Sequence, residues 1–287
     1  MVNTTALRVK SEELEIPFAN VFSGFVMESV IAMGAETSYC NDLWLCNQED
    51  FGLDVYKKTS VRSVSYQYCG EKDLLDFVKK YGEDICRHFG EQDFLVKQEE
   101  LKQDGQKVTL CFGGELEEKY IPFSVKFTKV SRSIGFPVEK HMRLFMENNK
   151  AVTVFLSPVE QILAEHFAYI LKDLELLNEM EHYVLAFDIL KTYPVEGRKI
   201  KNCLEQLCDT WHIPKNEKPY QLWRGYKDYT YMKKKWKVLL RKEKRSEPGW
   251  EEMFTLLEQF LAPIWEAICK EEIFFSDWMP EIARFLD

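Results

Sequence analysis

The sequence is poor in the residues and patterns that mark several structural classes. Only 13 glycines and 10 prolines occur among 287 residues, which disfavours an all-β sandwich and favours helices. No run of 18 apolar residues is present, so we expect no transmembrane helix and no membrane partner. Residues 1–15 lack a basic segment followed by an apolar one, so we expect a cytoplasmic protein rather than an exported one.

Metal-binding and disulfide patterns are also missing. None of the eight cysteines forms a C-x-x-C pair, and none lies near a spaced pair of histidines, so a zinc site has little support. Most cysteines stand among apolar residues, which is typical of small buried side chains in a reducing compartment. The net charge of −9 argues against a surface coated with cations for nucleic-acid binding, but it leaves a local basic patch open.

What the sequence does contain indicates a large core. Hydrophobic residues make up 46% of the chain and aromatic residues 14%. The apolar spacing predicts a helix, then strands mixed with helices, then four to six helices. This order is typical of an α+β fold, with a small mixed β-sheet and flanking helices in front and a helical bundle behind. We therefore predict a first domain over residues 1–155 and a helical domain over residues 156–287.

The first half has alternating helical and strand patterns. In the helix predicted from Pro17 to Cys40, Glu28 lies off the apolar stripe and is interpreted as part of a solvated face. The pair Gly113-Gly114 between alternating stretches indicates a hairpin turn, and residues 131–150 have the character of connecting structure. The other predictions are a short helix near residues 11–16, one or two helical turns after Gly52, a helix at 72–88, and strands at 43–46, 61–68, 93–99, 107–112, 119–129 and 151–156.

The clearest helical period covers residues 156–190. Ser157, Pro158 and Glu160 match a capping box, with Ser157 at the N-cap and Pro158 at the first helical position. A second helix, with His182 and Glu181 expected at the surface, runs to Leu190. The remaining predicted helices cover residues 198–211, 220–245 (one helix or two), 251–270 and 278–286.

One basic run stands out in this acidic chain, between Met232 and Arg245. Five of its cations are candidate contacts for nucleotide or RNA phosphates, and tyrosines and a tryptophan lie among them. The same run is also compatible with docking of an acidic partner or with a solvated helix face. The five cations are Lys233, Lys234, Lys235, Lys237 and Arg241.

Several of these segments together resemble the AbiEii-type nucleotidyltransferases, which are toxins of abortive-infection and toxin–antitoxin systems. The likeness is moderately specific over residues 151–287: the strand AVTVF, the helix SPVEQILAEHFAYIL, a paired helix ending FDIL, and the tail PGWEEMFTLLEQFLAPIWEAI. It is fainter in front, where Phe51-Gly52-Leu53 and the strand RSVSYQY resemble the family's opening glycines and its Arg-x-Ser/Thr-x-Asp-x-Asp strand.

The resemblance implies a metal site that this chain departs from. Aligned on Arg62, the two metal-binding aspartates of the family fall on Tyr66 and Tyr68, and Ser124 and Lys126 stand where a third carboxylate is expected. A tyrosine does not replace a carboxylate as a Mg²⁺ ligand near neutral pH. Mg²⁺ is therefore expected only if the protein is catalytically active. The family's helix lysine falls near His166, and its acidic motif is reduced to Asp188.

Other residues are candidates for the missing roles. Asp50 and Asp54 are four residues apart and would share a face on one helical turn as a metal pair might, although a helix-entry acid and a solvated acid are the simpler interpretation. His166 is a weak catalytic candidate, since a buried, hydrogen-bonded histidine is the simpler interpretation. Phosphate or RNA contacts in the first domain are expected from Gly52, Arg62, Ser63, Ser65 and Lys126.

Two hypotheses follow. The first is a toxin of the nucleotidyltransferase fold that acts on RNA or a nucleotide, with tRNA or another RNA and an NTP as partners. The second is a catalytically silent relative that binds RNA or a protein, such as a cognate antitoxin or another defence protein. The missing carboxylates favour the second.

Overall fold

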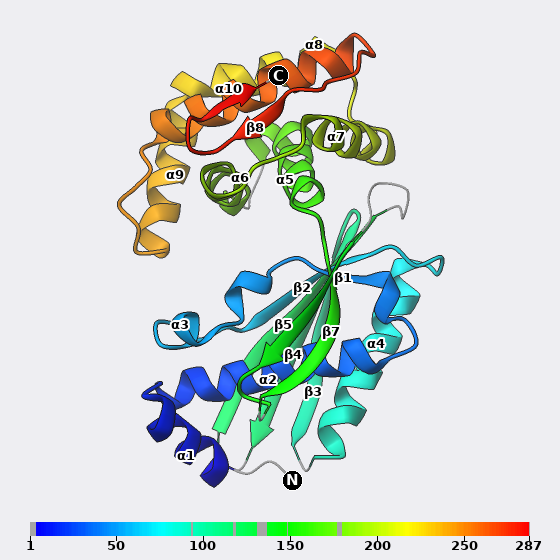
Figure 1. The fold of residues 1–287 in the computed structure, drawn as a ribbon, viewed down its shortest axis with the longest axis vertical. Helices are drawn as coiled ribbons and strands as arrows, with labels where there is room; N and C mark the ends of the chain where they lie inside the picture. The colour runs from blue at the N-terminus through cyan, green and yellow to red at the C-terminus, as the bar shows by residue number, and fades with distance from the viewer. Residues whose placement is uncertain are drawn as a thin grey trace. The chain divides into compact units, whose positions relative to one another are not determined.

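The computed structural model describes residues 4–92, 94–116, 119–130, 137–147, 149–176 and 180–286. The chain divides into two compact units, Met1–Ser157 and Pro158–Asp287. The first unit contains a mixed sheet with helices, and the second is helical apart from one short hairpin (Figure 1). The predicted α+β fold class is confirmed.

The first unit is built on one seven-stranded sheet with strand order β3-β4-β5-β2-β1-β7-β6. Its strands are β1 (Leu43–Leu45), β2 (Ser63–Tyr68), β3 (Leu95–Asp104), β4 (Lys107–Leu116), β5 (Lys119–Lys129), β6 (Val138–Leu144) and β7 (Lys150–Leu156). β2 pairs with β5 and β1 with β7 in parallel, and all other pairs are antiparallel. The helices are α1 (Thr4–Leu14), α2 (Phe18–Glu36), α3 (Leu53–Tyr56) and α4 (Leu74–Gly90), with one-turn 3-10 helices η1 (Cys40–Asp42) and η2 (Gln48–Asp50).

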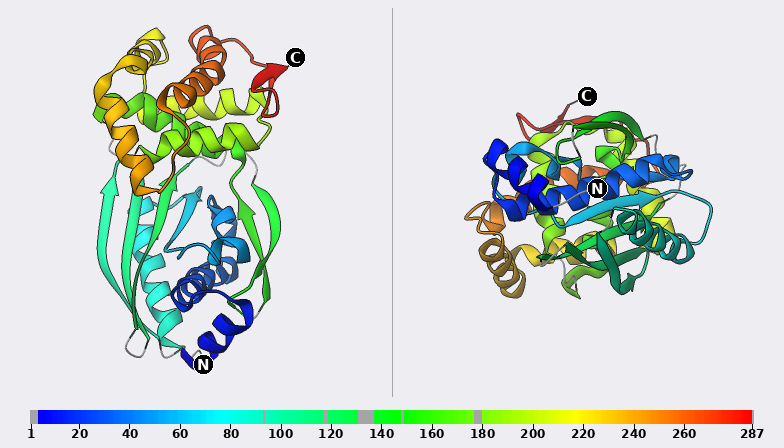
Figure 2. Two further views of the ribbon diagram at one scale, coloured as in Figure 1. Left: turned by 90° about the vertical axis from the view of Figure 1, so that its left-hand side faces the viewer. Right: turned by 90° about the horizontal axis from the view of Figure 1, so that it is seen from below.

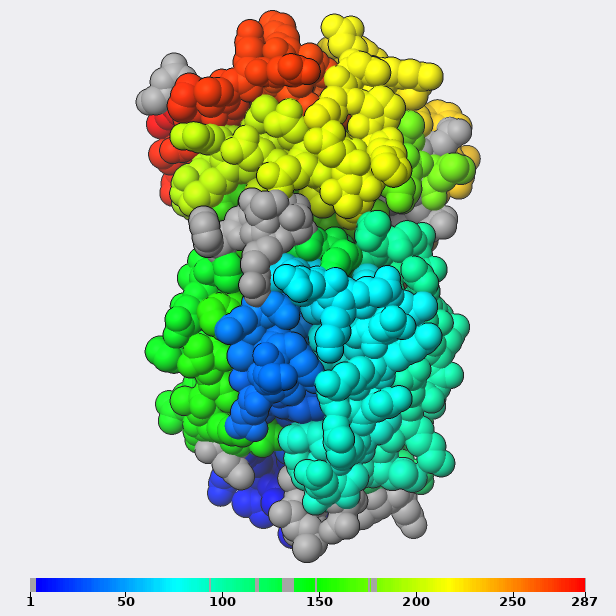
Figure 3. Space-filling view, turned by 90° about the vertical axis from the view of Figure 1, so that its right-hand side faces the viewer, coloured from blue at the N-terminus to red at the C-terminus, as the bar shows by residue number. Residues whose placement is uncertain are grey.

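Helices α2 and α4 cover one face of this sheet, with α2 against β2 and β7 and α4 against β3 and β4 (Figures 1 and 2). By length and composition α2 is apolar enough to cross a membrane, but 83% of its apolar window is buried inside the structure, as expected for a core helix. The segment that follows α2 lies beside α4 (Figure 3). Tyr39 Oη donates to Asp84 Oδ2 of α4 at 2.7 Å.

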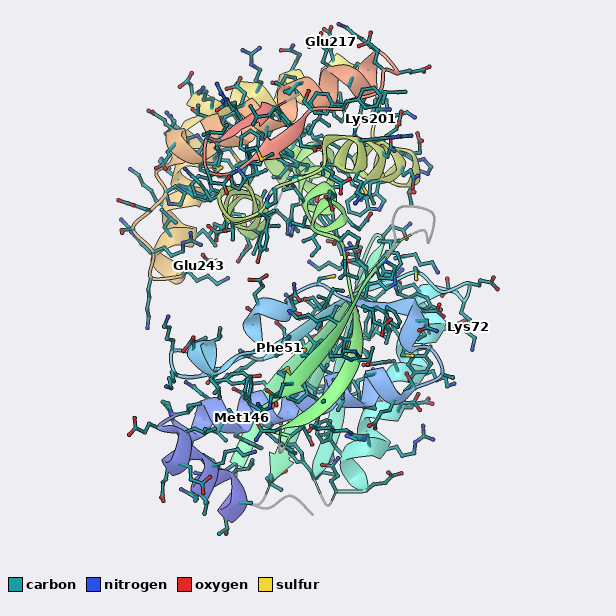
Figure 4. All side chains as sticks on the ribbon, in the orientation of Figure 1. Phe51, Lys72, Met146, Lys201, Glu217 and Glu243 are labelled. Atoms are coloured by element: carbon teal, nitrogen blue, oxygen red, sulfur yellow. The ribbon has the colours of Figure 1, made fainter. Side chains whose placement is uncertain are left out.

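The prediction that Glu28 lies on a solvated face is wrong. Its side chain is fully buried on α2 and accepts three hydrogen bonds: from Tyr56 Oη at 2.8 Å, from Met146 N at 2.5 Å and from Glu147 N at 3.2 Å. Burial is the largest influence on this carboxyl and raises the pKa of Glu28 to about 7, although all three donors oppose the rise. Glu28 thus fixes the turn between β6 and β7 to the core helix; Met146 is labelled there in Figure 4.

The prediction of a hairpin turn at Gly113-Gly114 is also wrong. Gly113 and Gly114 lie inside β4, opposite Pro122 and Ile121, and do not form a turn. A Cβ atom at Gly113 would lie 2.3 Å from a carboxylate oxygen of Glu99, so glycine leaves room for that neighbouring side chain. The tight turn is instead at Gly105, whose φ of 56° suits glycine between β3 and β4.

Residues 131–150 were predicted as connecting structure, but this region contains the edge strand β6. β6 pairs with β7 from Val138 to Leu144, although its charged residues hide the strand pattern. Charged side chains on an edge strand discourage pairing with other chains, which explains a strand with this composition. Residues 131–136 and 148 of the same prediction, and Asp93 at the start of another, lie outside the described residues.

The second unit consists of helices that bury a core rich in aromatic residues. Its helices are α5 (Val159–Asp173), α6 (Glu181–Thr192), α7 (Gly197–Trp211), α8 (Glu217–Arg224), α9 (Thr230–Lys242) and α10 (Trp250–Cys269), with 3-10 turns η4 (Leu174–Leu176) and η5 (Gly225–Asp228). The region 220–245 is therefore two helices. The predicted capping box does not form, because Ser157 Oγ donates to Gln67 Oε1 and Glu160 Oε1 accepts from Glu196 N at 3.1 Å.

The predicted closing helix at residues 278–286 is a β-hairpin, with strands β8 (Asp277–Met279) and β9 (Arg284–Leu286). Trp278 decides the conformation: its ring is fully buried and its Nε1 donates to the carbonyl oxygen of Leu190 at 2.9 Å. Its backbone also pairs with Val195 through bonds of 2.9 and 3.2 Å. Extended backbone lets the segment make both sets of bonds.

Candidate functional site

Strand β2 separates two sets of side chains on the two faces of the sheet. Val64, Tyr66 and Tyr68 belong to the hydrophobic core under α2 and α4. Tyr66 is 5% exposed and stacks on Phe127, and burial raises the pKa of its hydroxyl well above the usual value. The positions where the resemblance implies metal-binding aspartates therefore lie inside the core. Both positions hold tyrosines packed in this layer and offer no carboxylate to a metal ion.

The alternate residues of β2 form a polar cluster on the opposite face. Ser63 and Ser65 lie directly across from Ser124 and Lys126 of the parallel neighbour β5, and all four side chains are partly exposed. Because directly opposed residues project to the same side, Ser65 and Lys126 form one polar pair on this face. We call Asn47, Asp50, Ser63, Ser65 and Lys126 the β2–β5 cluster.

Asn47 organises this cluster, and no pattern in the sequence pointed to it. Its Oδ1 accepts from Ser65 N at 2.9 Å, and its Nδ2 donates to the carbonyl oxygen of Ser63 at 3.1 Å. The side chain therefore continues the hydrogen bonding of β1 for one step beyond the end of that strand. The same Nδ2 lies 2.8 Å from Asp50 Oδ2 and holds this carboxylate beside β2.

The charges of the β2–β5 cluster come from Lys126 and Asp50, and the neighbouring Glu49 also acts on Asp50. Partial desolvation raises the pKa of Asp50, while the Asn47 hydrogen bond and the positive charge of Lys126 act in the opposite direction. Asp50 remains solvent-accessible, so this shift contributes little to stability. Asp50 and Glu49 beside Lys126 do not supply the several hard oxygen ligands that Mg²⁺ needs, and the ammonium group repels the ion. No group of three or more His, Cys, Asp or Glu side chains in the described ranges is arranged for a metal ion.

Asp50 and Asp54 do not form the helical pair that their spacing suggested. Asp50 ends η2, Asp54 lies on α3, and the chain between them is extended at Gly52 (φ −161°, ψ 155°). The i,i+4 argument fails because no single helix contains both residues. Arg62 precedes β2 and is exposed, and Gly52 is half-buried at the start of α3.

His166 and Asp188 have structural partners in the second unit. The Nδ1 atoms of His166 and His182 lie 2.9 Å apart, and the ring of His182 stacks on Tyr169 at 4.4 Å. His182 is 6% exposed, so its predicted surface location is wrong. Asp188 binds both terminal nitrogens of Arg245, at 2.7 and 2.9 Å, which supplies a basic partner that lies 57 residues away in the sequence.

Comparison with known proteins finds distant similarity to solved structures. No protein-family model matches the sequence, and no curated protein matches it. Among solved structures, the chain is similar to JHP933 from Helicobacter pylori, with 11% identity and a TM-score of 0.40 over 86% of this chain and 90% of that one. It is similar at the same identity and TM-score to a structure from H. pylori provisionally named a nucleotidyltransferase, over 88% of this chain and 95% of that one. At this similarity we transfer no activity or site residue.

Proposed function

We propose that this protein is a nucleotidyltransferase-like protein that binds a phosphate-bearing nucleotide on the β2–β5 cluster and lacks metal-dependent nucleotidyl transfer. The observation that carries the proposal is the orientation of β2. Its two tyrosines fill the core, and the opposite face presents hydroxyl groups, an amide and Lys126 with one carboxylate. Hydroxyls and an ammonium group suit phosphate oxygens, whereas metal-assisted transfer needs several converging carboxylates.

Substitution of Asp50 tests whether the β2–β5 cluster binds an anion or a metal ion. Replacing Asp50 by Asn keeps the hydrogen-bonding shape and removes the negative charge beside Lys126. We therefore expect D50N to bind ATP or GTP several-fold more tightly, because a like charge no longer opposes the phosphates. A metal-ligand role predicts the opposite change. Isothermal titration with each NTP, in Mg²⁺ and in EDTA, measures both.

Lys126 provides the complementary test. We expect K126A to weaken NTP binding about tenfold, the effect of losing one charge-assisted contact, while K97A on the exposed edge strand leaves it unchanged. Affinity should be the same with Mg²⁺ and with EDTA, and incubation with tRNA and labelled NTPs should transfer no label. Mg²⁺-dependent binding, label transfer, or no NTP binding by the wild-type protein would each contradict the proposal.

The resemblance to AbiEii-type toxins extends the proposal to a toxin–antitoxin or phage-defence setting. A toxin that acts by binding should slow bacterial growth when its expression is induced, and D50N should slow growth at least as strongly as the wild-type protein. Growth curves after induction measure this. Unchanged growth with full soluble expression would remove the toxin part of the proposal and leave nucleotide binding untouched.

A further inference from the structure

The cations around α9 fall into two groups by their contacts. Lys233 pairs with Glu251 at 3.3 Å, Lys242 with Glu181 at 2.9 Å, and Arg245 with Asp188. In contrast, Lys234, Lys237 and Arg241 make no ion pair with any residue in the described part of the chain, and all three are exposed. The basic run thus has a paired group and an unpaired one.

The unpaired cations share one face of the helix. They are spaced by three and four residues, which places them within one stripe, about 10 Å long at a rise of about 1.5 Å per residue. The opposite face is buried through Met232, Trp236 and Leu239. The side chain of Val238 beside the stripe is 63% exposed. We call Lys234, Lys237 and Arg241 the α9 stripe.

Three tyrosines shortly before the α9 stripe in the sequence contact one another in order. We call Tyr226, Tyr229 and Tyr231 the tyrosine ladder. The rings of Tyr226 and Tyr229 stack with centroids 5.8 Å apart, and Tyr229 and Tyr231 follow at 6.0 Å. Tyr229 and Tyr231 are 42% and 49% exposed, which is unusual for large rings in a unit that buries most of its aromatic residues. Lys235 Nζ lies 4.9 Å from the centroid of the Tyr231 ring and helps to hold it in place.

We propose that the α9 stripe and the tyrosine ladder bind single-stranded nucleic acid. Three unpaired cations on one face of a protein with a net charge of −9 suit a polyanion, and exposed rings next to them suit unstacked bases. A duplex keeps its bases stacked inside and cannot use the rings. An acidic protein partner would pair with the cations but would leave the tyrosines without a role. The site uses residues of the second unit only, so a test of this proposal is independent of any test of nucleotide binding on the β2–β5 cluster.

The test uses fluorescence anisotropy with labelled 12-nucleotide single-stranded RNA, the same sequence as DNA, its duplex, and a poly-glutamate peptide. We expect both single strands to bind at least tenfold more tightly than the duplex or the peptide. Equal binding of the duplex, tighter binding of the peptide, or no binding of either single strand would overturn the proposal.

Variants separate charge from stacking. The triple variant K234E/K237E/R241E should lose about 100-fold in affinity at low salt and most of the salt dependence, whose slope for three phosphate contacts on a single strand is about −2. The control K79E/K97E/K218E carries the same charge change on exposed lysines elsewhere and should bind as the wild type does. Y229A and Y231A should each lose about tenfold without changing the salt slope. Equal losses in the control and the triple variant would contradict a specific site.

Discussion

Replacing Glu28 by Gln is expected to make the protein more stable at pH 8, by about 3 kcal/mol, and to leave its stability nearly unchanged at pH 5. Burial raises the pKa of Glu28 to about 7 in the folded protein, against an ordinary value of 4.5. A shift of this size corresponds to about 3 kcal/mol, at about 1.4 kcal/mol for each pH unit. The glutamine imitates the protonated acid: its oxygen can accept from Met146 N and Glu147 N, and its amide can donate to Tyr56 Oη.

The direction of the pH effect follows from proton binding. Between pH 4.5 and about 7 the folded state holds a proton on Glu28 that the unfolded state has released. The stability contributed by this group is therefore fully present below pH 4.5 and is lost as the pH rises to about 7. Other carboxylates titrate in both proteins and cancel in the difference between wild type and E28Q.

The measurement is urea unfolding of both proteins at pH 5, 6, 7 and 8. E28A serves as the control for the hydrogen bonds, because it leaves three buried donors unsatisfied and should be less stable than E28Q at every pH. Parallel stability curves for wild type and E28Q would show that Glu28 does not change its protonation in this range, and the prediction would then be wrong.

Replacing Trp278 by Ala is expected to destabilise the second unit by about 3–5 kcal/mol, as for other large aromatic side chains removed from a core. The ring is fully buried between Phe260 and Phe285, at centroid distances of 5.2 and 5.3 Å. Its loss also leaves the Leu190 carbonyl oxygen without the donor that it has now. No other change in the C-terminal hairpin should have a comparable effect.

A matched control lies three residues away. Phe275 is 69% exposed, so F275A should change stability by no more than about 0.5 kcal/mol. W278F keeps a buried aromatic ring but loses the Nε1 bond and part of the indole volume, so an intermediate loss of about 1–3 kcal/mol is expected, and this variant remains measurable if W278A fails to fold. Urea unfolding followed by circular dichroism gives all three values. Equal losses for W278A and F275A would contradict the assigned role of the indole.

The sequence predicted elements well where their apolar period was regular. The helices α2, α4, α7 and α10 and the strands β1, β2, β5 and β7 are confirmed, because apolar spacing alone indicates such segments. The failures have physical causes of two kinds. β6 is an edge strand with charged residues, and the hairpin after Ser276 takes its form from a bond between Trp278 and Leu190, 88 residues apart. Neither long-range bonds nor edge positions leave a local pattern.

Most residues of the candidate site were predictable from the sequence, but Asn47 and the orientation of β2 were not. Alternation along RSVSYQY separates Ser63 and Ser65 from Tyr66 and Tyr68, yet a strand by itself does not indicate which side faces the helices. The side of β2 that faces the helices is determined by Tyr81 of α4 and Phe127 of β5, which pack against Tyr66. Glu28 was misjudged for a related reason. A helix surrounded on all sides by the core has no solvated face, so a carboxylate off the apolar stripe is buried as well.

The parallel pairing of β1 with β7 has a consequence for how the protein is made. The partners Trp44 and Phe155 are separated by more than a hundred residues, so β1 lacks its second neighbour until nearly the whole first unit has left the ribosome. Until then, one edge of β1 and part of the apolar surface of α2 lack the strands that cover them in the folded protein. Contacts at this sequence separation form slowly and expose the nascent chain to aggregation. In the second unit, α5 contacts α6 and α7 at much shorter sequence separations, so this part of the unit can form as soon as those three helices have been synthesised.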